Sequence, residues 1–258
     1  MNEQLKMVRE KVAGRPKLLV PQTAGFVYCP GCQEPLAARI IAEVLEELEV
    51  GGKSIGIFDI GCVSFLLGVL DIDALNTPHG RPPDMATAIK RAYPDNIVFT
   101  VQGDGGLLAI GADPLLGVLT RSEKITIIML NNTVYGTTGG QMAPTSLVGQ
   151  TTTTTPEGRD VTRFGFPVHA AEMIATFKGV AYCARGAFNT PANYQRTRRY
   201  MKTAFQKQMD NIGLSFVEII CACPPNWHMS PQDSLKWIEE KLILEFPLGE
   251  FKNVDRLE

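Results

Sequence analysis

The 258-residue sequence lacks long apolar runs, a strong excess of either charge and any internal repeat. No apolar stretch reaches the roughly 18–20 residues that a membrane-spanning helix needs, so a spanning segment is not expected. The formal net charge of −2 gives no electrostatic reason to expect binding to nucleic acid or to an anionic membrane. The segment Met1–Arg15 is charged and has no apolar core like that of a signal peptide, and we therefore expect a cytoplasmic protein.

The sequence does contain a regular alternation of predicted strands and helices. This alternation predicts an α/β fold, in which a parallel sheet carries helices on both faces. No composition shift marks a domain boundary, so we expect a single domain over residues 1–258, with an N-terminal arm (1–28) and a C-terminal tail (242–258). The predicted strands are 54–60, 98–103, 125–131, 180–184 and 214–221, and the predicted helices are 34–49, 85–92, 107–119, 170–177, 192–209 and 230–241.

Two consecutive predicted strands end abruptly in polar or glycine residues. Asp104 follows the first strand and lies between glycines, and Asn132 follows the second. The carboxyl ends of parallel strands meet at one edge of a sheet, where ligands bind. Hard oxygen ligands suit Mg²⁺, and glycines let backbone N–H groups approach phosphates. The pattern favours a metal-diphosphate site, although a glycine-rich turn and an asparagine cap would look similar.

Six cysteines are present, and in a cytoplasmic chain they are read first as metal ligands or redox groups rather than disulfides. Cys29 and Cys32 can grip one metal or one cluster, and Cys62 and Cys223 could complete a four-thiolate site. The number of cysteines does not distinguish a zinc site from an iron–sulfur cluster. A thioredoxin-like redox pair belongs to a much smaller fold and fits this chain poorly. Cys183 lies inside a predicted strand and is interpreted as a small core residue. The role of Cys221 is not determined by the sequence.

Each of two further segments can be interpreted either as a functional segment or as one without a specific role. The loop His79-Gly80-Arg81 can donate hydrogen bonds to a phosphate or a ring, or it can be a solvated turn. The stretch 135–165 has no periodicity, and loops of that length are usually functional or partner-bound. The alternative is a disordered insertion.

Together these motifs resemble the thiamine-diphosphate-binding β subunits of 2-oxoacid:ferredoxin oxidoreductases, most of all the short branch that includes 2-oxoisovalerate and 2-oxoglutarate enzymes. The resemblance runs from Tyr28 to Lys252. It is carried by Cys29-Pro30-Gly31-Cys32, Ile60-Gly61-Cys62, His79-Gly80-Arg81, Gln102-Gly103-Asp104-Gly105, Asn131-Asn132-Thr133-Val134-Tyr135-Gly136-Thr137-Thr138-Gly139-Gly140-Gln141, Cys221-Ala222-Cys223-Pro224-Pro225-Asn226-Trp227 and Phe246-Pro247-Leu248-Gly249.

The resemblance implies a thiamine-diphosphate-binding fold and an activity. A branched-chain 2-oxoacid or 2-oxoglutarate would be oxidatively decarboxylated to CO₂ and an acyl-CoA, with coenzyme A as co-substrate. Electrons would pass through a four-iron cluster, [4Fe-4S], to ferredoxin. It also implies a hetero-oligomer with an α subunit and, in some complexes, γ and δ subunits. No glutamate of this sequence is assigned to activating the cofactor, a role that the resemblance gives to the α subunit, so the chain alone is expected to be inactive.

The resemblance also assigns residues to each cofactor, and Cys62 falls in both groups. Mg²⁺ would be held by Asp104, Asn132 and the carbonyl of Val134. The diphosphate would be lined by Gly105, Gly106, Gly136 and Thr137. The rest of thiamine diphosphate would be lined by Ile60, Gly61, Cys62, Val63, His79, Gly80, Arg81 and Pro82. The cluster would be ligated by Cys29, Cys32, Cys62 and Cys223.

The sequence departs from the family pattern at three places. Gln33 replaces the glycine common after the second cysteine, and Val63 replaces the serine common after the third. The stretch Phe65–Gly68 is unusually apolar, which indicates an altered pocket. Two alternatives fit part of the pattern: a thiamine-dependent decarboxylase or carboligase without iron, and a zinc-stabilised module without enzymatic activity.

Overall fold

The structure, a computed structural model, describes residues 14–20 and 27–257. The arm predicted over 1–28 therefore lies largely outside the described residues. In its described part, the backbone N–H of Leu18 donates to Glu46 Oε1 at 2.6 Å. Leu19 forms an isolated antiparallel bridge with Leu70. This short segment is thus tied to the body of the protein.

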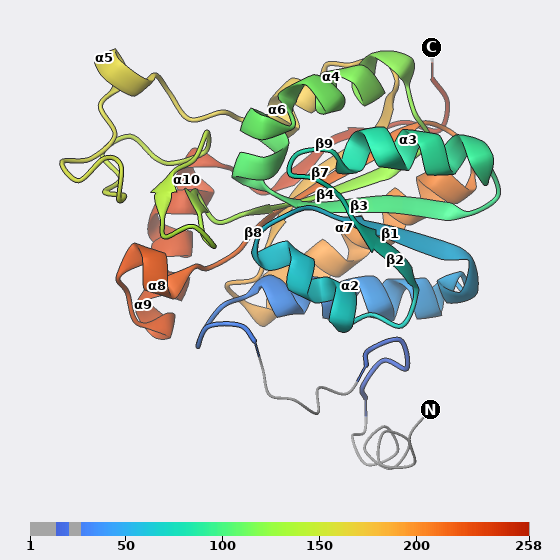
Figure 1. The fold of residues 1–258 in the computed structure, drawn as a ribbon, viewed down its shortest axis with the longest axis horizontal. Helices are drawn as coiled ribbons and strands as arrows, with labels where there is room; N and C mark the ends of the chain where they lie inside the picture. Colours follow the sequence, from blue (N-terminus) through green and yellow to red (C-terminus); the bar gives the residue numbers. More distant parts are fainter. Residues whose placement is uncertain (1–13, 21–26, 258) are drawn as a thin grey trace.

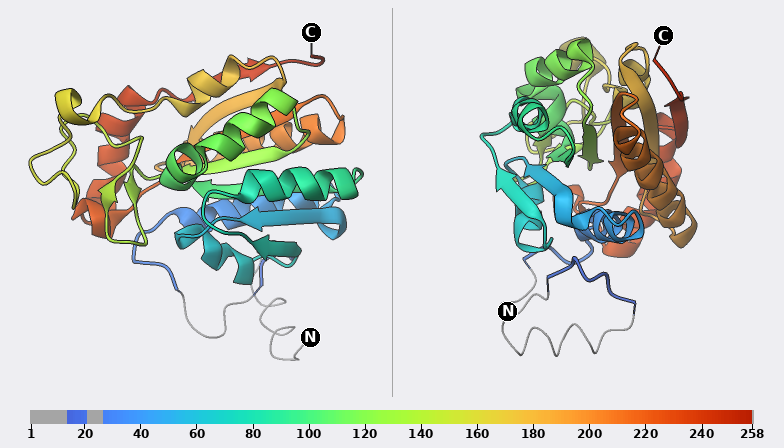
Figure 2. Two further views of the ribbon diagram at one scale, coloured as in Figure 1. Left: turned by 45° about the horizontal axis from the view of Figure 1, so that its top comes forward. Right: turned by 90° about the vertical axis from the view of Figure 1, so that its right-hand side faces the viewer.

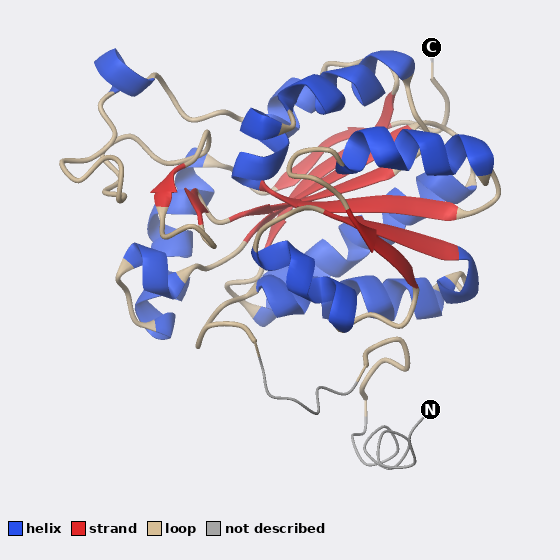
Figure 3. Ribbon diagram, viewed as in Figure 1, coloured by secondary structure: helices blue, strands red, loops and turns tan. Residues whose placement is uncertain are grey.

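A seven-stranded sheet runs through the centre of the described chain, in the order β2-β1-β3-β4-β8-β7-β9 (Figures 1 and 3). Every adjacent pair is parallel except β7 and β9, which are antiparallel. The central strands are buried along their length, as expected where helices cover both faces. The prediction of a parallel α/β sheet is confirmed. The strands are β1 (Ser54–Phe58), β2 (Asp73–Asn76), β3 (Ile97–Gly103), β4 (Thr126–Asn131), β7 (Val180–Ala187), β8 (Leu214–Ile220) and β9 (Gly249–Asn253), with a separate hairpin of β5 (Val134–Tyr135) and β6 (Gln141–Met142).

Helices cover both faces of the sheet (Figures 1 and 2). Residues of α2 and α7 form one apolar core with β1, β3 and β8, and residues of α3, α4 and α6 form a second core on the other face. No helix in the described part of the chain is long and apolar enough to cross a membrane. The helices are α2 (Glu34–Glu47), α3 (Pro82–Ala92), α4 (Ala112–Arg121), α5 (Val161–Phe164), α6 (Ala170–Ala175), α7 (Pro191–Met209), α8 (Pro224–Trp227), α9 (Pro231–Trp237) and α10 (Ile243–Glu245); 3₁₀ turns span Gly51–Lys53 and Cys62–Gly68, and π segments span Gly106–Ile110 and Ile238–Leu242.

The structure differs from the predicted elements at three places. Strand β2 was not predicted, and the expected C-terminal tail contains β9, which pairs with β7 at the edge of the sheet. The helix predicted over 107–119 is interrupted at Gly111. A Cβ at Gly80 would lie 2.7 Å from the backbone nitrogen of Gly111, so two chain segments touch there backbone to backbone. That close approach requires glycine and separates the π segment from α4.

The aperiodic segment after β4 is organised by one buried side chain. The guanidinium of Arg159 donates to the carbonyls of Pro144, Ser146 and Gly165 at 2.6–3.0 Å. It also donates to the carbonyls of Phe164 and Phe166 at 3.1 and 2.7 Å. These hydrogen bonds hold the segment in a defined conformation, so it is not a disordered insertion. In Figure 1 it projects beyond the carboxyl ends of the strands, together with α5.

Candidate active site

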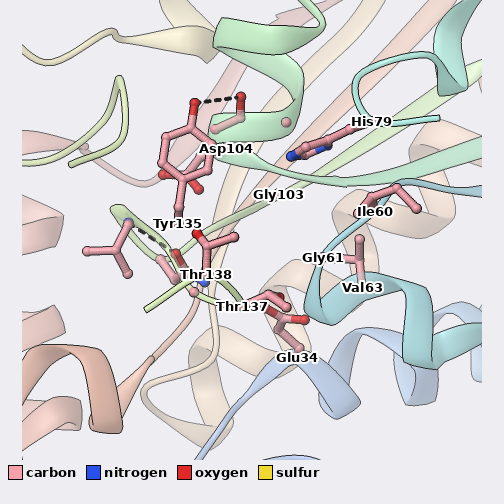
Figure 4. Close-up of a pocket in the computed structure, with 15 residues that line it drawn as sticks. Glu34, Ile60, Gly61, Val63, His79, Gly103, Asp104, Tyr135, Thr137 and Thr138 are labelled. Atoms are coloured by element: carbon pink, nitrogen blue, oxygen red, sulfur yellow. Dashed lines mark hydrogen bonds between the residues drawn. The ribbon is translucent and has the colours of Figure 1, made fainter. Parts of the chain in front are cut away.

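A pocket opens at the carboxyl ends of β1, β3 and β4, where the sequence predicted a binding site (Figure 4). Most predicted cofactor residues line it. Cys62, Gly80, Arg81 and Pro82 are not among its lining residues. Arg81 instead pairs with Asp113 at 2.8 Å, and Pro82 begins α3. The lining residues are Glu34, Ile60, Gly61, Val63, His79, Gly103, Asp104, Gly105, Gly106, Asn132, Val134, Tyr135, Gly136, Thr137 and Thr138.

Asp104 is a buried carboxylate that makes no ion pair with a lysine or arginine of the described residues. Burial raises its pKa to about 7, although hydrogen bonds from the Thr145 hydroxyl and the backbone of Gly105 act in the opposite direction. The negative charge of Glu218 also raises the pKa of Asp104. A buried carboxylate is expensive to ionise unless a cation binds it. The environment of Asp104 therefore fits a metal ion.

Asn132 is held in a fixed orientation by its own turn. Its Oδ1 accepts a hydrogen bond from the backbone N–H of Val134 at 3.1 Å, and its carbonyl accepts one from Trp227 Nε1 at 2.9 Å. Thr133, which lies between Asn132 and Val134 in the sequence, has a φ of 62°, and this value is unfavourable for a β-branched residue. Ser146 donates a hydrogen bond to the carbonyl of Thr133. Strained backbone of this kind is kept where the surrounding structure fixes it, often at functional sites.

The glycines of the pocket fall into two groups. A Cβ at Gly61, Gly103 or Gly136 would meet nothing closer than 3.6 Å, so these positions leave room for a ligand against the backbone. A Cβ at Gly105 would lie 2.2 Å from the ring of Tyr135, and one at Gly106 would lie 2.2 Å from Asp59 Oδ2. Glycine is thus required at 105 and 106 by packing inside the protein.

Asp59, which the sequence did not single out, positions His79. The fully buried carboxylate lies 3.0 Å from His79 Nδ1 and accepts a hydrogen bond from the backbone N–H of Gly80 at 2.8 Å. Gln102 Nε2 also donates to it, at 3.3 Å. These contacts fix the His79 ring in the pocket wall. Position 59 could have been noticed because it follows β1 as Asp104 follows β3.

Of the four cysteines predicted as cluster ligands, Cys62 contacts a residue of the pocket wall directly, and Cys223 is linked to the wall through Asn226. Cys62 Sγ lies 2.9 Å from Thr137 Oγ1. Cys223 Sγ accepts a hydrogen bond from Asn226 Nδ2 at 3.2 Å, and the same amide nitrogen donates to the carbonyl of Gly136 at 2.9 Å. The turn at Gly136–Thr137 therefore connects the thiols with the pocket.

The thiols of Cys29, Cys32, Cys62 and Cys223 lie in one region of the protein, where their charges affect one another's pKa. Burial raises the pKa of Cys62 to about 11, and Cys223 and Cys29 raise it further. Burial likewise raises the pKa of Cys32, with added repulsion from Cys223 and Cys62. Within residues 14–20 and 27–257, no three Cys, His, Asp or Glu side chains lie close enough to hold one metal ion. Cys183 is buried in β7, as predicted for a core residue.

Comparison with known proteins identifies the family. Residues 59–219 match the thiamine pyrophosphate enzyme C-terminal TPP-binding domain. The chain belongs to this family. Thiamine pyrophosphate is another name for thiamine diphosphate, and the resemblance inferred from the motifs is confirmed at this level.

Relatives of known name place this thiamine-diphosphate-binding chain more narrowly. It is 36% identical over 226 residues to the ketoisovalerate oxidoreductase subunit VorA of Methanothermobacter thermautotrophicus, covering 88% of this chain and 47% of that protein. It is 33% identical over 225 residues to the 2-oxoglutarate synthase subunit KorB of Methanocaldococcus jannaschii, covering 84% of this chain and 78% of that protein. The chain thus spans about half the length of the ketoisovalerate relative.

A solved structure shares the fold. The 2-oxoglutarate:ferredoxin oxidoreductase from Magnetococcus marinus aligns with a TM-score of 0.76 over 95% of this chain and 87% of that chain, at 22% identity. At this identity the similarity supports the thiamine-diphosphate-binding fold alone.

Glu34 is the pocket residue of this family member that sequence reasoning missed. It is the first residue of α2 and is buried, and its Oε2 makes no hydrogen bond within the described residues. Burial raises its pKa to about 8, and the charge of Asp104 raises it further. It also raises the pKa values of Cys32 and Cys62. The charge of Glu34 therefore acts on both the thiols and the carboxylate of Asp104. Its position two residues after Cys32 was the only sequence signal.

Proposed function

We propose that this chain is the thiamine-diphosphate-binding subunit of a 2-oxoacid:ferredoxin oxidoreductase, which converts a 2-oxoacid and coenzyme A to an acyl-CoA and CO₂ and reduces ferredoxin. The observation that supports this most directly is the 2.9 Å contact between Cys62 Sγ and Thr137 Oγ1, because Thr137 lines the pocket that contains Asp104 and Asn132. A thiol at this wall could attach an electron acceptor next to the cofactor. A simple decarboxylase does not need one.

Asp104, Asn132 and the carbonyl of Val134 would hold Mg²⁺ against the diphosphate. The burial of Asp104 without a cation and the fixed turn at Asn132 support this assignment. Gly61, Gly103 and Gly136 would let the ligand lie against the backbone. Thiamine diphosphate, when bound, would supply the electron sink that decarboxylation of a 2-oxoacid requires.

Cys29, Cys32, Cys62 and Cys223 would ligate one [4Fe-4S] cluster. Their thiolates repel one another, and binding of cationic iron would relieve this repulsion. The hydrogen bond from Asn226 to Cys223 Sγ would influence the reduction potential, since hydrogen bonds to ligand sulfurs do so in such clusters.

Partner subunits complete the proposal. We assign the activating carboxylate to an α subunit, and the complex would contain γ and δ subunits where the relatives have them. Ferredoxin and coenzyme A would bind to the assembled complex. Assembly should therefore be required for turnover, whereas binding of thiamine diphosphate should not require it.

Anaerobic purification of this chain with iron and sulfide, followed by a visible absorption spectrum and calorimetric titration with Mg²⁺ and thiamine diphosphate, tests the proposal. We expect iron–sulfur absorption and saturable cofactor binding in the same preparation. Cofactor binding without iron would support the decarboxylase or carboligase alternative. Tight zinc binding without thiamine diphosphate would support the non-enzymatic module. The chain mixed with its partners should then reduce ferredoxin with a 2-oxoacid and coenzyme A.

A further inference from the structure

We propose that the substrate of this site is a 2-oxoacid with an apolar side chain, selected by the apolar segment from Ile60 to Phe65. This inference rests on the proposed function and goes beyond it by choosing between substrate classes. An aliphatic side chain, such as that of 2-oxoisovalerate, would bind, and a side chain that ends in a carboxylate, such as that of 2-oxoglutarate, would be rejected.

Large apolar side chains are exposed along this segment. Ile60 and Val63 line the pocket, and Ile60 is 44% exposed although it directly follows the buried strand end at Asp59. Phe65 is 45% exposed. Ligand pockets are lined mainly by apolar groups that bury the apolar part of the ligand. Ile60 and Phe65 therefore offer apolar surface on both sides of Cys62.

Phe65 is held next to Cys62 by a defined contact. Its ring packs edge-on against Tyr28, with ring centroids 5.8 Å apart and an interplanar angle of 87°. The hydroxyl of Tyr28 donates to the carbonyl of Cys62 at 3.2 Å. Leu66, the next residue, is fully buried and anchors the 3₁₀ turn. The aromatic surface is thus fixed beside Cys62, close in sequence to the lining residue Val63 but not itself in the pocket lining.

The described lining of the pocket contains no lysine or arginine, and its acidic members are Glu34 and Asp104. Arg81, in the loop beside it, is already paired with Asp113 at 2.8 Å and lies 3.7 Å from Asp84. Glu34 supplies no positive charge in either protonation state. A second substrate carboxylate would lose its water without gaining a lysine or arginine partner from the described lining of this pocket, which is strongly unfavourable. An apolar side chain has no such penalty.

The test uses the holoenzyme assembled with its partner subunits and compares kcat/KM for 2-oxoisovalerate and 2-oxoglutarate. The wild type should prefer 2-oxoisovalerate by about a hundredfold, the scale of an unpaired buried charge. Phe65→Lys should increase the relative use of 2-oxoglutarate by about tenfold, because the new ammonium can pair with the second carboxylate. Phe65→Leu keeps the site apolar and should keep the preference.

A second charge variant is the control. Leu116→Lys adds the same charge on α4, at a position 53% exposed and outside the pocket lining, and should leave the ratio unchanged. Thiamine diphosphate affinity and cluster absorption should be the same in all these variants. If Phe65→Lys does not assemble, the wild-type ratio of kcat/KM for the two substrates decides the inference.

The outcomes separate this inference from the function on which it rests. A wild-type holoenzyme that uses 2-oxoglutarate as well as or better than 2-oxoisovalerate would overturn the inference and leave the proposed function intact. The same would follow if lysine at 65 and at 116 changed the ratio equally. A holoenzyme that binds both cofactors but turns over no 2-oxoacid would overturn both.

Discussion

Asn131, at the end of β4, donates a hydrogen bond to Glu218 Oε1 in β8 at 2.8 Å. The other oxygen of Glu218 accepts one from Arg185 Nε at 2.8 Å, and both members of this ion pair are fully buried. Asn131 Oδ1 accepts a hydrogen bond from the backbone N–H of Thr133 at 3.1 Å. A buried ion pair in the neighbouring strands thus supports the turn that presents Asn132.

Glu218→Ala should lower the free energy of unfolding by about 3 kcal/mol, because it leaves the buried charge of Arg185 with Glu172 as its remaining acidic partner. Urea titration measures this. The matched control is Glu47→Ala, which breaks exposed pairs with Arg198 and Lys202 and should cost less than about 1 kcal/mol. Equal losses in the two variants would contradict the importance of the buried pair.

Asp104 should give the metal-free chain a characteristic pH dependence. Burial raises its pKa from 3.8 to about 7. An acid whose pKa is higher in the folded than in the unfolded state binds extra protons when folded, so the free energy of unfolding should fall as the pH rises from about 4 to about 7. Asp104→Asn should remove this part of the slope in urea titrations across that range.

The same variant tests the assigned metal ligand. Mg²⁺ with thiamine diphosphate should raise the melting temperature of the wild type at pH values above the pKa of Asp104, because ligands that bind only the folded state stabilise it. Asp104→Asn should lose this increase while retaining the visible absorption of the cluster. Loss of both cofactors together would indicate that Asp104 is needed for folding and not specifically for Mg²⁺.

Glu34→Gln should stabilise the metal-free chain, and more strongly at alkaline pH. The pKa of Glu34 is raised to about 8 by burial and by Asp104. The free energy of unfolding therefore falls as the pH rises from about 4.5 to about 8 and stays lower above that, and glutamine of the same shape removes this penalty. Thermal unfolding at acidic and alkaline pH measures the difference. The control Glu43→Gln, which weakens a hydrogen bond with Arg39 on the surface, should give no stabilisation at either pH.

The strand ends could be predicted because local sequence determines them. An apolar run followed by a carboxylate or carboxamide marks a parallel strand and its functional end, as at Asp104 and Asn132. The two missed strands have no such signal. β2 has the sequence Asp-Ala-Leu-Asn and β9 Gly-Glu-Phe-Lys-Asn, and both lie at sheet edges where pairing, not burial, holds them.

Long-range partners could not be predicted for a different reason. Glu34 reads as an ordinary acidic residue at a helix start, and its burial depends on where the sheet places Asp104 and the thiols. Arg159 has the sequence features of an ordinary loop arginine, yet it donates hydrogen bonds to five carbonyl groups of its segment. Such roles depend on contacts between residues far apart in the sequence, and periodicity carries no information about them.

Arg159→Lys should loosen the segment 144–166 without unfolding the sheet. Lysine is a point charge and cannot reproduce a fork that reaches five carbonyl groups. Hydrogen exchange in this segment should become faster, while the exchange of β3 and β4 stays slow. Affinity for thiamine diphosphate should fall, because Thr145 and Ser146 contact Asp104 and Thr133. Uniformly faster exchange throughout the chain would show instead that Arg159 stabilises the whole fold.

Gln33 connects the first cysteine pair with the strand end that carries Cys223. Its Nε2 donates to the carbonyl of Phe188 at 2.9 Å, and its Oε1 accepts from the backbone N–H of Ala222 at 2.8 Å. Gln33→Ala leaves both buried groups unpaired and should cost about 1–3 kcal/mol in the free energy of unfolding. Because Ala222 directly precedes Cys223, the variant should also lose cluster absorption faster in air. Gln195→Ala, on the exposed face of α7, is the control and should change neither property. A variant at position 33 that is less stable but loses its cluster at the wild-type rate would show that Gln33 supports the fold and not the cluster ligands.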